Sequence, residues 1–396
     1  MKISQCFSAD FETTTDKDDC RVWAYALSNV ENPKEFSYGN SIDGFMDFCA
    51  NSQINYTMYF FNLKFDGSFI ISWLLQNGFE RIDSPKDRQN KTFTTLITDR
   101  GAFYAIEIYF EVKGKHTNKV KILDAMKLFP NFSVERLAES FGLPISKLEL
   151  DYHEKRSEGH ELTPNEIDYI RNDVEIVAWA LKAMFEKGLT KMTIASNAMS
   201  DFRGRCKYFN SYFPTLTPDI DGFVRASYRG GFTYLNDIYT AKEVGKGVTL
   251  DVNSLYPSVL KFCTMPVGTP QYFEGKYETD SDYNLYVQTL TCRFKLKPTK
   301  IPCIQIKHTM DFINNEYLKS SDGQLVTLTL TSVDLKLFFM QYDVSDITYV
   351  GGWKFKSARH IFDSYIDFWT NEKITAGKEG NKGKRQIAKL MLNSLY

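Results

Sequence analysis

Predicted strands alternate with predicted helices in the first half of this sequence, and that alternation limits the fold more than any other feature. Runs of β-branched and aromatic residues predict strands at 3–12, 56–62 and 102–112. One helix is predicted at 68–76, where Asn77-Gly78 ends it. Another begins at Thr163-Pro164-Asn165-Glu166, a capping box with proline at the first helical position, and runs to about Glu186. This alternation predicts an α/β first domain.

The sequence changes in character after about residue 246. Residues 247–260, GVTLDVNSLYPSVL, predict a strand and then a turn into a helix. The stretch 270–350 is rich in Tyr, Thr, Val and Pro, which predicts a β-rich insertion. Helical spacing with many lysines returns from Ser357 onwards.

Composition excludes few classes of function. The 396 residues include 48 basic and 49 acidic side chains, so a nucleic acid would have to bind local basic patches. No apolar stretch approaches the roughly 18 residues of a membrane span, and acids interrupt the N-terminal segment, so we expect a cytoplasmic protein without membrane contact. The cysteines are odd in number and lack a C-x-x-C pair, which predicts reduced, buried thiols: Cys6, Cys20, Cys49, Cys206, Cys263, Cys292 and Cys303.

Two acids with one residue between them end the first predicted strand. In Asp10-Phe11-Glu12, the two-residue period of a strand places both carboxylates on one face. Such carboxylates repel each other unless a cation lies between them, and Mg²⁺ prefers carboxylate oxygens together with water and phosphate oxygens. Taken alone, the pair is more often a solvated strand surface than a metal site.

Two further acidic motifs follow in the same predicted domain. Asp66 lies in Asn62-Leu63-Lys64-Phe65-Asp66-Gly67, between an apolar strand and a helix, where it could equally be a helix N-cap. Tyr169 and Asp173 are four residues apart and therefore share one face of the capped helix. Each motif alone is weak. Together, four acids and a tyrosine can build a two-metal phosphodiesterase site, in which the tyrosine orients the attacking water.

These motifs, in this order, resemble the three exonuclease motifs of family B DNA polymerases. The resemblance implies metal binding by Asp10, Glu12, Asp66 and Asp173, with two Mg²⁺ ions per active site, or Mn²⁺ in their place. It also implies that Asn62, Phe65 and Thr13 hold a single-stranded 3′ end. Lys147, shortly before Asp151-Tyr152-His153, resembles a catalytic lysine of the protein-primed subgroup, and its alternative is a surface lysine.

Polymerase-type motifs occupy the second half of the chain. Asp251-Val252-Asn253-Ser254-Leu255-Tyr256-Pro257-Ser258 resembles motif A, which implies a catalytic metal ligand at Asp251 and nucleotide contacts at Ser254, Leu255 and Tyr256. Tyr256 would lie under the sugar of the incoming nucleotide and exclude a 2′-hydroxyl. Upstream, Tyr228-Arg229-Gly230-Gly231 resembles the Y-x-G-G motif, whose glycines let the backbone approach a phosphate and whose tyrosine can stack there.

The last residues predict a helix with a basic and polar stripe. Arg385, Lys389 and Asn393 recur at i, i+4 and i+8, a spacing suited to a triphosphate but also common in amphipathic helices. The pattern K-x-x-x-N-S-L-Y resembles motif B of the fingers, and Lys373 resembles a further triphosphate-contacting lysine. The match stops at Tyr396, before the glycine that continues motif B, and motif C has no counterpart. Because one carboxylate cannot fix a two-metal site, we expect no nucleotidyl transfer by this chain alone and an apolar palm surface that needs a partner.

The resemblance extends over essentially the whole chain and is strongest to protein-primed polymerases of small tailed bacteriophages. It implies an RNase H-like 3′→5′ exonuclease domain, an incomplete palm, a β-rich insertion that contacts the terminal protein, and the start of the fingers, at 1–190, 191–262, 263–360 and 361–396. The implied partners are DNA as a single-stranded 3′ end or a primer-template, dNTPs and the terminal (primer) protein, in the cytoplasm of a bacterial host. Two positions depart from the pattern: Phe61 replaces a histidine, and Ala125 replaces a DNA-contacting serine.

Three functions remain in competition. The first is a DNA polymerase fragment whose motif C comes from a missing or separate C-terminal part. The second is a stand-alone 3′→5′ single-stranded DNA exonuclease, and the third is a non-catalytic module that binds DNA and the primer protein. Retention of Asp251 and Lys389 favours a polymerase origin, because an exonuclease needs neither, and the intact exonuclease acids argue against a purely binding module.

Overall fold

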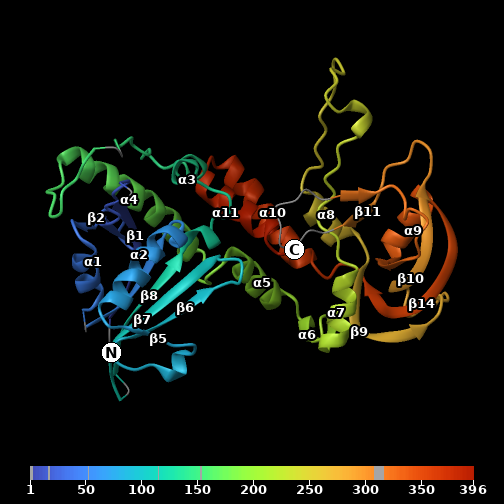
Figure 1. The fold of residues 1–396 in the computed structure, drawn as a ribbon, viewed down its shortest axis with the longest axis horizontal. Coiled ribbons are helices and arrows are strands. Elements are labelled where there is room, and N and C mark those ends of the chain that lie inside the picture. The colour runs from blue at the N-terminus through green and yellow to red at the C-terminus, as the bar shows by residue number, and fades with distance from the viewer. Residues whose placement is uncertain (1–2, 17, 52, 115, 152–153, 307–315) are drawn as a thin grey trace. The chain divides into compact units, whose positions relative to one another are not determined.

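The structure is a computed structural model that describes residues 3–16, 18–51, 53–114, 116–151, 154–306 and 316–396. The chain divides into two compact units (Figure 1), and each is described by itself. Unit 1 comprises Met1–Phe202 and Tyr365–Tyr396, and unit 2 comprises Arg203–Ser364. Within the described residues, no helix combines the length and the apolar character that a bilayer crossing requires.

An eight-stranded sheet forms the centre of unit 1, in the order β3-β2-β1-β4-β8-β7-β6-β5. Strand β1 pairs in parallel with β4, which pairs in parallel with β8, whereas β1 and β2 are antiparallel. The strands are β1 (Ile3–Thr13), β2 (Val22–Asn29), β3 (Phe36–Gly39), β4 (Ile54–Phe60), β5 (Glu80–Arg81), β6 (Thr92–Ile97), β7 (Phe103–Lys113) and β8 (His116–Asp124). The three strands predicted in this region are therefore confirmed.

Helices cover both faces of this sheet. Apolar side chains of α1 (Ile42–Cys49) and α2 (Leu63–Gln76) form one core cluster with odd-numbered residues of β1, such as Phe7 and Phe11. The long helix α4 (Pro164–Glu186) packs against β1 and β2 through a second cluster that contains Trp23 and Tyr169. Because successive side chains of a strand point to opposite faces, the even-numbered residues of β1 face the α4 side.

Unit 1 also contains α3 (Val134–Phe141), most of α5 (Ile194–Arg205) and α10 (Asp363–Lys378), and α11 (Lys382–Asn393). Helix α11 packs against α3 and α4 (Figure 1). The capping box that opens α4 is confirmed, since the Thr163 hydroxyl accepts from the Glu166 backbone and the Glu166 carboxylate accepts from Thr163 N. The predicted helix at 68–76 begins five residues earlier than expected, at Leu63.

Unit 2 is built around a four-stranded antiparallel sheet in the order β13-β10-β14-β9. Helix α9 (Ser332–Gln341) contributes Phe338 to a core with Phe294 of the sheet. The strands are β9 (Met265–Glu274), β10 (Leu285–Leu296), β13 (Val326–Thr331) and β14 (Tyr342–Ala358), with a separate hairpin of β11 (Ile304–Ile306) and β12 (Glu316–Leu318). A Cβ atom on Gly352 would lie 2.0 Å from Val287 O, so only glycine fits where β14 approaches β10. The β-rich character predicted for 270–350 is confirmed.

Two expectations fail in the described structure. The predicted strand at 247–250 is absent: these residues are irregular and exposed, and Asp251 follows them on the same loop. Strand-forming composition is not sufficient, because a strand needs a hydrogen-bonded neighbour and no described segment pairs with this one. The helix predicted after it does form, as α8 (Leu255–Phe262). All seven cysteines are free thiols as expected, but Cys20 and Cys263 are exposed because they lie on a loop and at a helix end.

Candidate functional site

The end of β1 brings the first two acids to the α4 side of the sheet. Phe11 points to the opposite face, where its ring packs 4.9 Å from that of Phe45 and 5.0 Å from that of Phe60. Asp10 and Glu12 flank it in the strand, so both carboxylates lie on the face that α4 covers. The pairing of β1 with β2 shifts register between Glu12 and Thr13, so Thr13 sits at an irregularity of the kind that re-aims side chains beside functional sites.

The first turn of α2 places Asp66 beside the same strand end. Asn62 is the N-cap in the left-handed conformation, with φ of 75°, and Asp66 is only 3% exposed within the first helical turn. The alternative of Asp66 as the N-cap is therefore wrong. The backbone N–H of Phe11 donates to the Asp66 carboxylate, which ties α2 to β1.

Helix α4 contributes Tyr169 and Asp173 on one face. Both side chains are buried, and the Tyr169 hydroxyl hydrogen-bonds the Asp173 carboxylate, as the four-residue spacing predicts. Lys147 Nζ lies 3.0 Å from Asp173 Oδ2 and 5.7 Å from the centre of the Tyr169 ring. The position of Lys147 beside Asp173 is consistent with the expected functional lysine. Tyr152 and His153 of the neighbouring motif lie outside the described residues.

Burial and mutual repulsion make the four acids hard to ionise. Burial, followed by the charge of Asp173, raises the pKa of Asp10 to about 7. Burial, followed by the charges of Asp10 and Asp173, raises the pKa of Glu12 to about 9. Burial also raises the pKa of Asp66, with Asp10 as the next cause, and the pKa of Asp173, where Lys147 opposes the rise. The four carboxylates therefore share one electrostatic environment.

The oxygen atoms of this cluster are of the chemical kind that a divalent cation binds. Asp66 Oδ1 and Asp173 Oδ1 are buried and have no hydrogen-bond partner among the described residues. Unpaired buried carboxylate oxygens are unfavourable unless a cation compensates them, and hard cations such as Mg²⁺ bind such oxygens. No group of three or more Asp, Glu, His or Cys in the described ranges converges tightly enough to enclose a metal ion directly. The two-metal site therefore stays a prediction that the donor set supports.

One cavity is lined by acids of the cluster, and a second is lined by residues of the first turns of α2. One of about 280 Å³ is lined on its polar side by Asp10, Lys147 and Asp173, and Phe61 also lines it, so the departure from histidine lies at the site itself. The other, of about 580 Å³, is lined by Cys20, Asn62, Lys64, Phe65, Ser68, Phe69 and Ser72. Phe65 is 52% exposed there and its ring lies 5.6 Å from that of Phe69. Ala125, the second departure, is fully buried and offers no surface to a ligand.

The polymerase-type residues of unit 2 lie on exposed segments. Tyr228, Gly230, Gly231 and Asp251 are exposed, and Gly230 borders a cavity of about 350 Å³ that Arg229 and Phe232 also line. Ser254 is the N-cap of α8 with φ of 53°, and Leu255 and Tyr256 follow it, 49% and 48% exposed. The irregular backbone at Ser254 is of a kind that often occurs at functional turns.

The basic and polar stripe predicted on α11 is exposed in the structure, as expected. Arg385, Lys389 and Asn393 are exposed, whereas Ile387, Leu390 and Met391 are buried. Lys373 lies on α10 and is half-buried.

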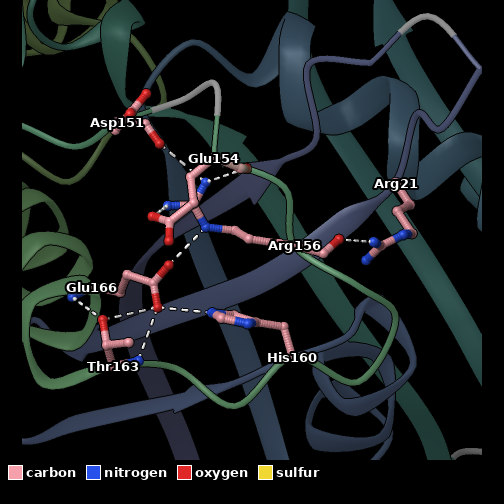
Figure 2. A network of polar contacts seen from close by, with 7 residues as sticks. All are labelled: Arg21, Asp151, Glu154, Arg156, His160, Thr163 and Glu166. Carbon is pink, nitrogen blue, oxygen red and sulfur yellow. Dashed lines mark hydrogen bonds and ion pairs between the residues drawn. The ribbon is translucent and has the colours of Figure 1, made fainter.

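The sequence does not indicate the role that three further residues have at the site. Asp124 Oδ1 accepts from the backbone N–H groups of Asn62 and Leu63, at 3.3 and 3.5 Å, and so fixes the start of α2. Arg156 and Glu166 form a buried ion pair of 2.7 Å between the loop that carries Lys147 and the start of α4 (Figure 2). The capping box pointed to Glu166 as a structural residue, but nothing local to Asp124 or Arg156 predicts contacts this distant in sequence.

Comparisons with known proteins place the chain in a family. The family model described as DNA polymerase type B, organellar and viral, matches residues 49–158 and 149–396. The DNA polymerase of Bacillus phage M2 is 45% identical over 392 residues, which are 98% of this chain and 67% of that protein. The crystal structure of phi29 DNA polymerase in an orthorhombic form superposes with a TM-score of 0.94 at 43% identity, over 99% of this chain and 67% of the other. The phi29 enzyme complexed with single-stranded DNA gives a TM-score of 0.92 at 43% identity, with the same coverage. The chain thus spans about two thirds of the length of these relatives.

Proposed function

The chain belongs to the type B DNA polymerases of organelles and viruses, and on that premise we propose that unit 1 is a 3′→5′ exonuclease. It would remove nucleotides one at a time from a single-stranded DNA 3′ end by hydrolysis. The observation that carries the proposal is the cluster of Asp10, Glu12, Asp66 and Asp173, of which Asp10 is half-buried and the other three are buried. The acidic neighbours raise the pKa of Asp10, of Glu12 and of Asp66, in addition to the effect of burial. Such a cluster is costly to maintain in a fold and is expected where a cation is bound.

Each residue of the cluster has a role in the proposed hydrolysis. The four carboxylates would hold two Mg²⁺ ions, or Mn²⁺ ions, which supply an activated water and stabilise the departing 3′ oxygen. The Tyr169 hydroxyl, held by Asp173, would orient the water for in-line attack on the terminal phosphodiester. Lys147, beside Asp173, would stabilise the negative charge that develops on the phosphorus oxygens.

The substrate would reach this cluster through the cavity lined by Asn62 and Phe65. The exposed ring of Phe65 and the half-buried ring of Phe69 offer a stacking surface to unpaired bases, and stacking of bases on aromatic rings is tolerant of sequence. Thr13 and Asn62 flank the strand end and could bind the sugar or phosphate of the last nucleotides. The solved complex of the phi29 enzyme with single-stranded DNA supports this class of substrate.

The test is the digestion of a 5′-labelled single-stranded oligonucleotide with and without Mg²⁺. We expect a ladder of products shortened from the 3′ end, which chelation removes and which Asp10→Ala/Glu12→Ala abolishes. A 3′-phosphorothioate end should slow the first cleavage. Activity that persists in the double variant would show a contaminating nuclease and defeat the proposal.

A second proposed function concerns DNA synthesis, for which a different set of residues is present. Asp251 and Tyr256 match motif A, and the α11 stripe of Arg385 and Lys389 is exposed for a triphosphate. The segment around motif A carries exposed apolar side chains, among them Val248, Leu250, Val252, Leu255, Val259 and Phe262. An exposed apolar surface of this extent is typical of an interface.

We propose that polymerisation requires a further polypeptide segment that covers this apolar surface and supplies the carboxylates that Asp251 lacks. Protein priming by a terminal protein, with the β-rich insertion as its contact, is part of the same proposal. Primer extension on a primed template should be absent with this chain alone and present once the C-terminal third of a phage relative is added in trans. Extension by this chain alone would overturn the requirement and leave the exonuclease proposal intact.

A further inference from the structure

Lys147 lies on a segment that has no helix or strand among its described residues, from 143 to 163. Near the lysine, two contacts connect this segment to α4. Lys147 Nζ forms an ion pair with Asp173, and Asn172 Nδ2 donates to Ser146 O at 3.1 Å. Irregular segments keep conformational freedom unless long-range contacts remove it, and a reacting group has to be held to within a fraction of an ångström. Contacts farther along the segment therefore determine how well Lys147 is placed.

Arg156 makes these contacts from a buried position. Its Nε donates to Glu166 Oε1 at 2.7 Å, and its Nη1 donates to the backbone oxygens of Asp151 and Glu154, both at 3.1 Å (Figure 2). The guanidinium also lies 4.3 Å from the centre of the Trp23 ring on β2, and the side chain is only 3% exposed. One side chain thus joins the irregular segment, the central sheet and α4.

Glu166 transmits this anchoring to the helix that carries the reacting groups. Its Oε2 accepts from Thr163 N at 2.8 Å and lies 2.9 Å from His160 Nε2, so three points of the chain converge on one carboxylate (Figure 2). Glu166, Tyr169 and Asp173 are spaced i, i+3 and i+7, which places them along one face of α4. Arg156 is therefore bound to the same helical face as the nuclease groups.

The charge of Arg156 also reaches the acidic cluster. Together with Lys147, it opposes the rise in the pKa of Glu12. Its Nη2 is buried without a hydrogen-bond partner among the described residues, at 3.5 Å from Glu154 Oε2. A buried guanidinium usually has its donors satisfied, so the unpaired Nη2 donor is an exception in an otherwise bonded side chain.

We propose that Arg156 is a positioning residue of the nuclease site, which locks the 143–163 segment onto Glu166 so that Lys147 stays beside Asp173. The inference rests on the proposed exonuclease function and adds a residue to it. Because Arg156 is buried and its Nε and Nη1 atoms bind protein groups, it acts through Lys147 and does not touch the DNA. Partners that orient a reacting side chain from behind contribute about 10- to 100-fold to activity in metal-dependent sites.

The first test compares Arg156→Met with Arg156→Lys in the hydrolysis of single-stranded DNA. Methionine keeps the packing on Trp23 but removes the charge and the fork of donors, so we expect kcat to fall about 10- to 100-fold with KM changed less than about threefold. Lysine keeps the charge and should recover part of the loss. Arg171→Met is the matched control, because Arg171 also stacks on an aromatic ring, Phe36, and also pairs with an acid, yet lies on the surface of α4. It should leave the rate within about twofold of the wild type.

The second test is a double-mutant cycle with Lys147→Met. If Arg156 acts by placing Lys147, then Arg156→Met should lower kcat less than about threefold once Lys147 is already absent. The same fold-loss in both backgrounds, or a loss expressed in KM, would overturn the proposal and indicate a general effect on the fold or on DNA binding.

A third measurement separates this proposal from the exonuclease itself. Hydrogen exchange should become faster in residues 143–151 of Arg156→Met, while the central residues of α4 keep their protection. If the wild type has no nuclease activity, the proposed function fails, but faster exchange still supports the anchoring of the Lys147 segment by Arg156. Unchanged exchange in 143–151 would refute the anchoring whatever the activity.

Discussion

Lys147 Nζ lies 3.0 Å from Asp173 Oδ2, at the wall of a cavity that Asp10 also lines. The two residues come from an irregular segment and from α4, 26 positions apart in the sequence. The lysine partly compensates the acidic cluster, since it lowers the pKa of Asp10 and of Asp173 against the effect of burial. The ammonium group of Lys147 therefore lies in the same site as any metal cations that the carboxylates bind.

Replacement of Lys147 by methionine should slow hydrolysis without preventing DNA binding. We expect kcat on single-stranded DNA to fall about 10²- to 10³-fold, the range observed when one group that stabilises developing charge is removed. The KM should change little, because in the proposed mechanism the ammonium group would contact the reacting phosphate and not the bases. Lys155→Met, an exposed lysine on the same segment, is the control and should behave as the wild type.

The stability of the metal-free protein should depend on pH through Asp10 and Glu12. Their folded pKa values of about 7 and about 9 lie above the ordinary values of 3.8 and 4.5, so the unfolded chain releases these protons first as pH rises. Stability from this source is therefore lost progressively from about pH 4 to about pH 9. Mg²⁺ that binds only the folded, ionised cluster offsets the loss, so the rise in Tm on adding Mg²⁺ should be larger at pH 8.5 than at pH 6.

The matched variant for this prediction is Asp10→Asn/Glu12→Gln, which removes both charges with little change in shape. In chelator it should be more stable than the wild type near pH 8.5, and Mg²⁺ should no longer raise its Tm. An equal Mg²⁺ effect in the variant and the wild type would place the ion elsewhere.

Phe65→Ala should weaken the binding of single-stranded DNA. Loss of one aromatic stacking partner corresponds to about 1–3 kcal/mol, or roughly 5- to 150-fold in affinity. The fold should be unaffected, because Phe65 is 52% exposed. Leu75→Ala on the same helix is the control, since Leu75 is 58% exposed and lies outside the cavity that Phe65 lines. Fluorescence anisotropy of a labelled oligonucleotide would measure both, and equal affinities for the two variants would argue against stacking on Phe65.

The Glu166 carboxylate should make the fold sensitive to acid. Burial alone would raise its pKa, but hydrogen bonds from Thr163, His160 and Arg156 outweigh burial and lower the pKa to about 2. A lowered folded pKa gives stability that is present above the unfolded value of 4.5 and is lost as pH falls toward 2. Glu166→Gln, which can still cap α4, should therefore be less stable than the wild type at pH 7 by about 1–3 kcal/mol, with the difference shrinking toward pH 2. Glu186→Gln at the exposed end of α4 should show neither effect in denaturant titrations at the two pH values.

Local patterns predicted the parts of the site that depend on one element at a time. The two-residue period of β1 and the four-residue spacing of α4 set the directions of Glu12, Tyr169 and Asp173, and the structure agrees. The predicted start of α2 is wrong because the contact that fixes it is not local. The backbone N–H of Asn62 donates to Asp124, which lies 62 positions away in the sequence. The sequence around Arg156 does not indicate its role either, because its ring partner Trp23 lies on a distant strand and its ion-pair partner Glu166 is separated from it by an irregular segment.

Local patterns fail in the segment before Asp251, where the predicted strand does not form. Residues 247–250 have the composition of a buried strand but are exposed and irregular, because strand formation depends on a neighbour as well as on propensity. The helix after it forms because its hydrogen bonds lie within the segment. Predictions from sequence are thus safest where the hydrogen-bond partners are near in the chain.

The most direct test of the central claim is the release of the 3′-terminal dNMP in a single turnover, measured across a Mg²⁺ titration for the wild type and for Asp10→Asn/Glu12→Gln. We predict release from the 3′ end that requires Mg²⁺ and falls by at least about 10³-fold in the variant, whose folding circular dichroism would check. Release at the wild-type rate in the variant, or no release by a folded wild type at any Mg²⁺ concentration, would contradict it.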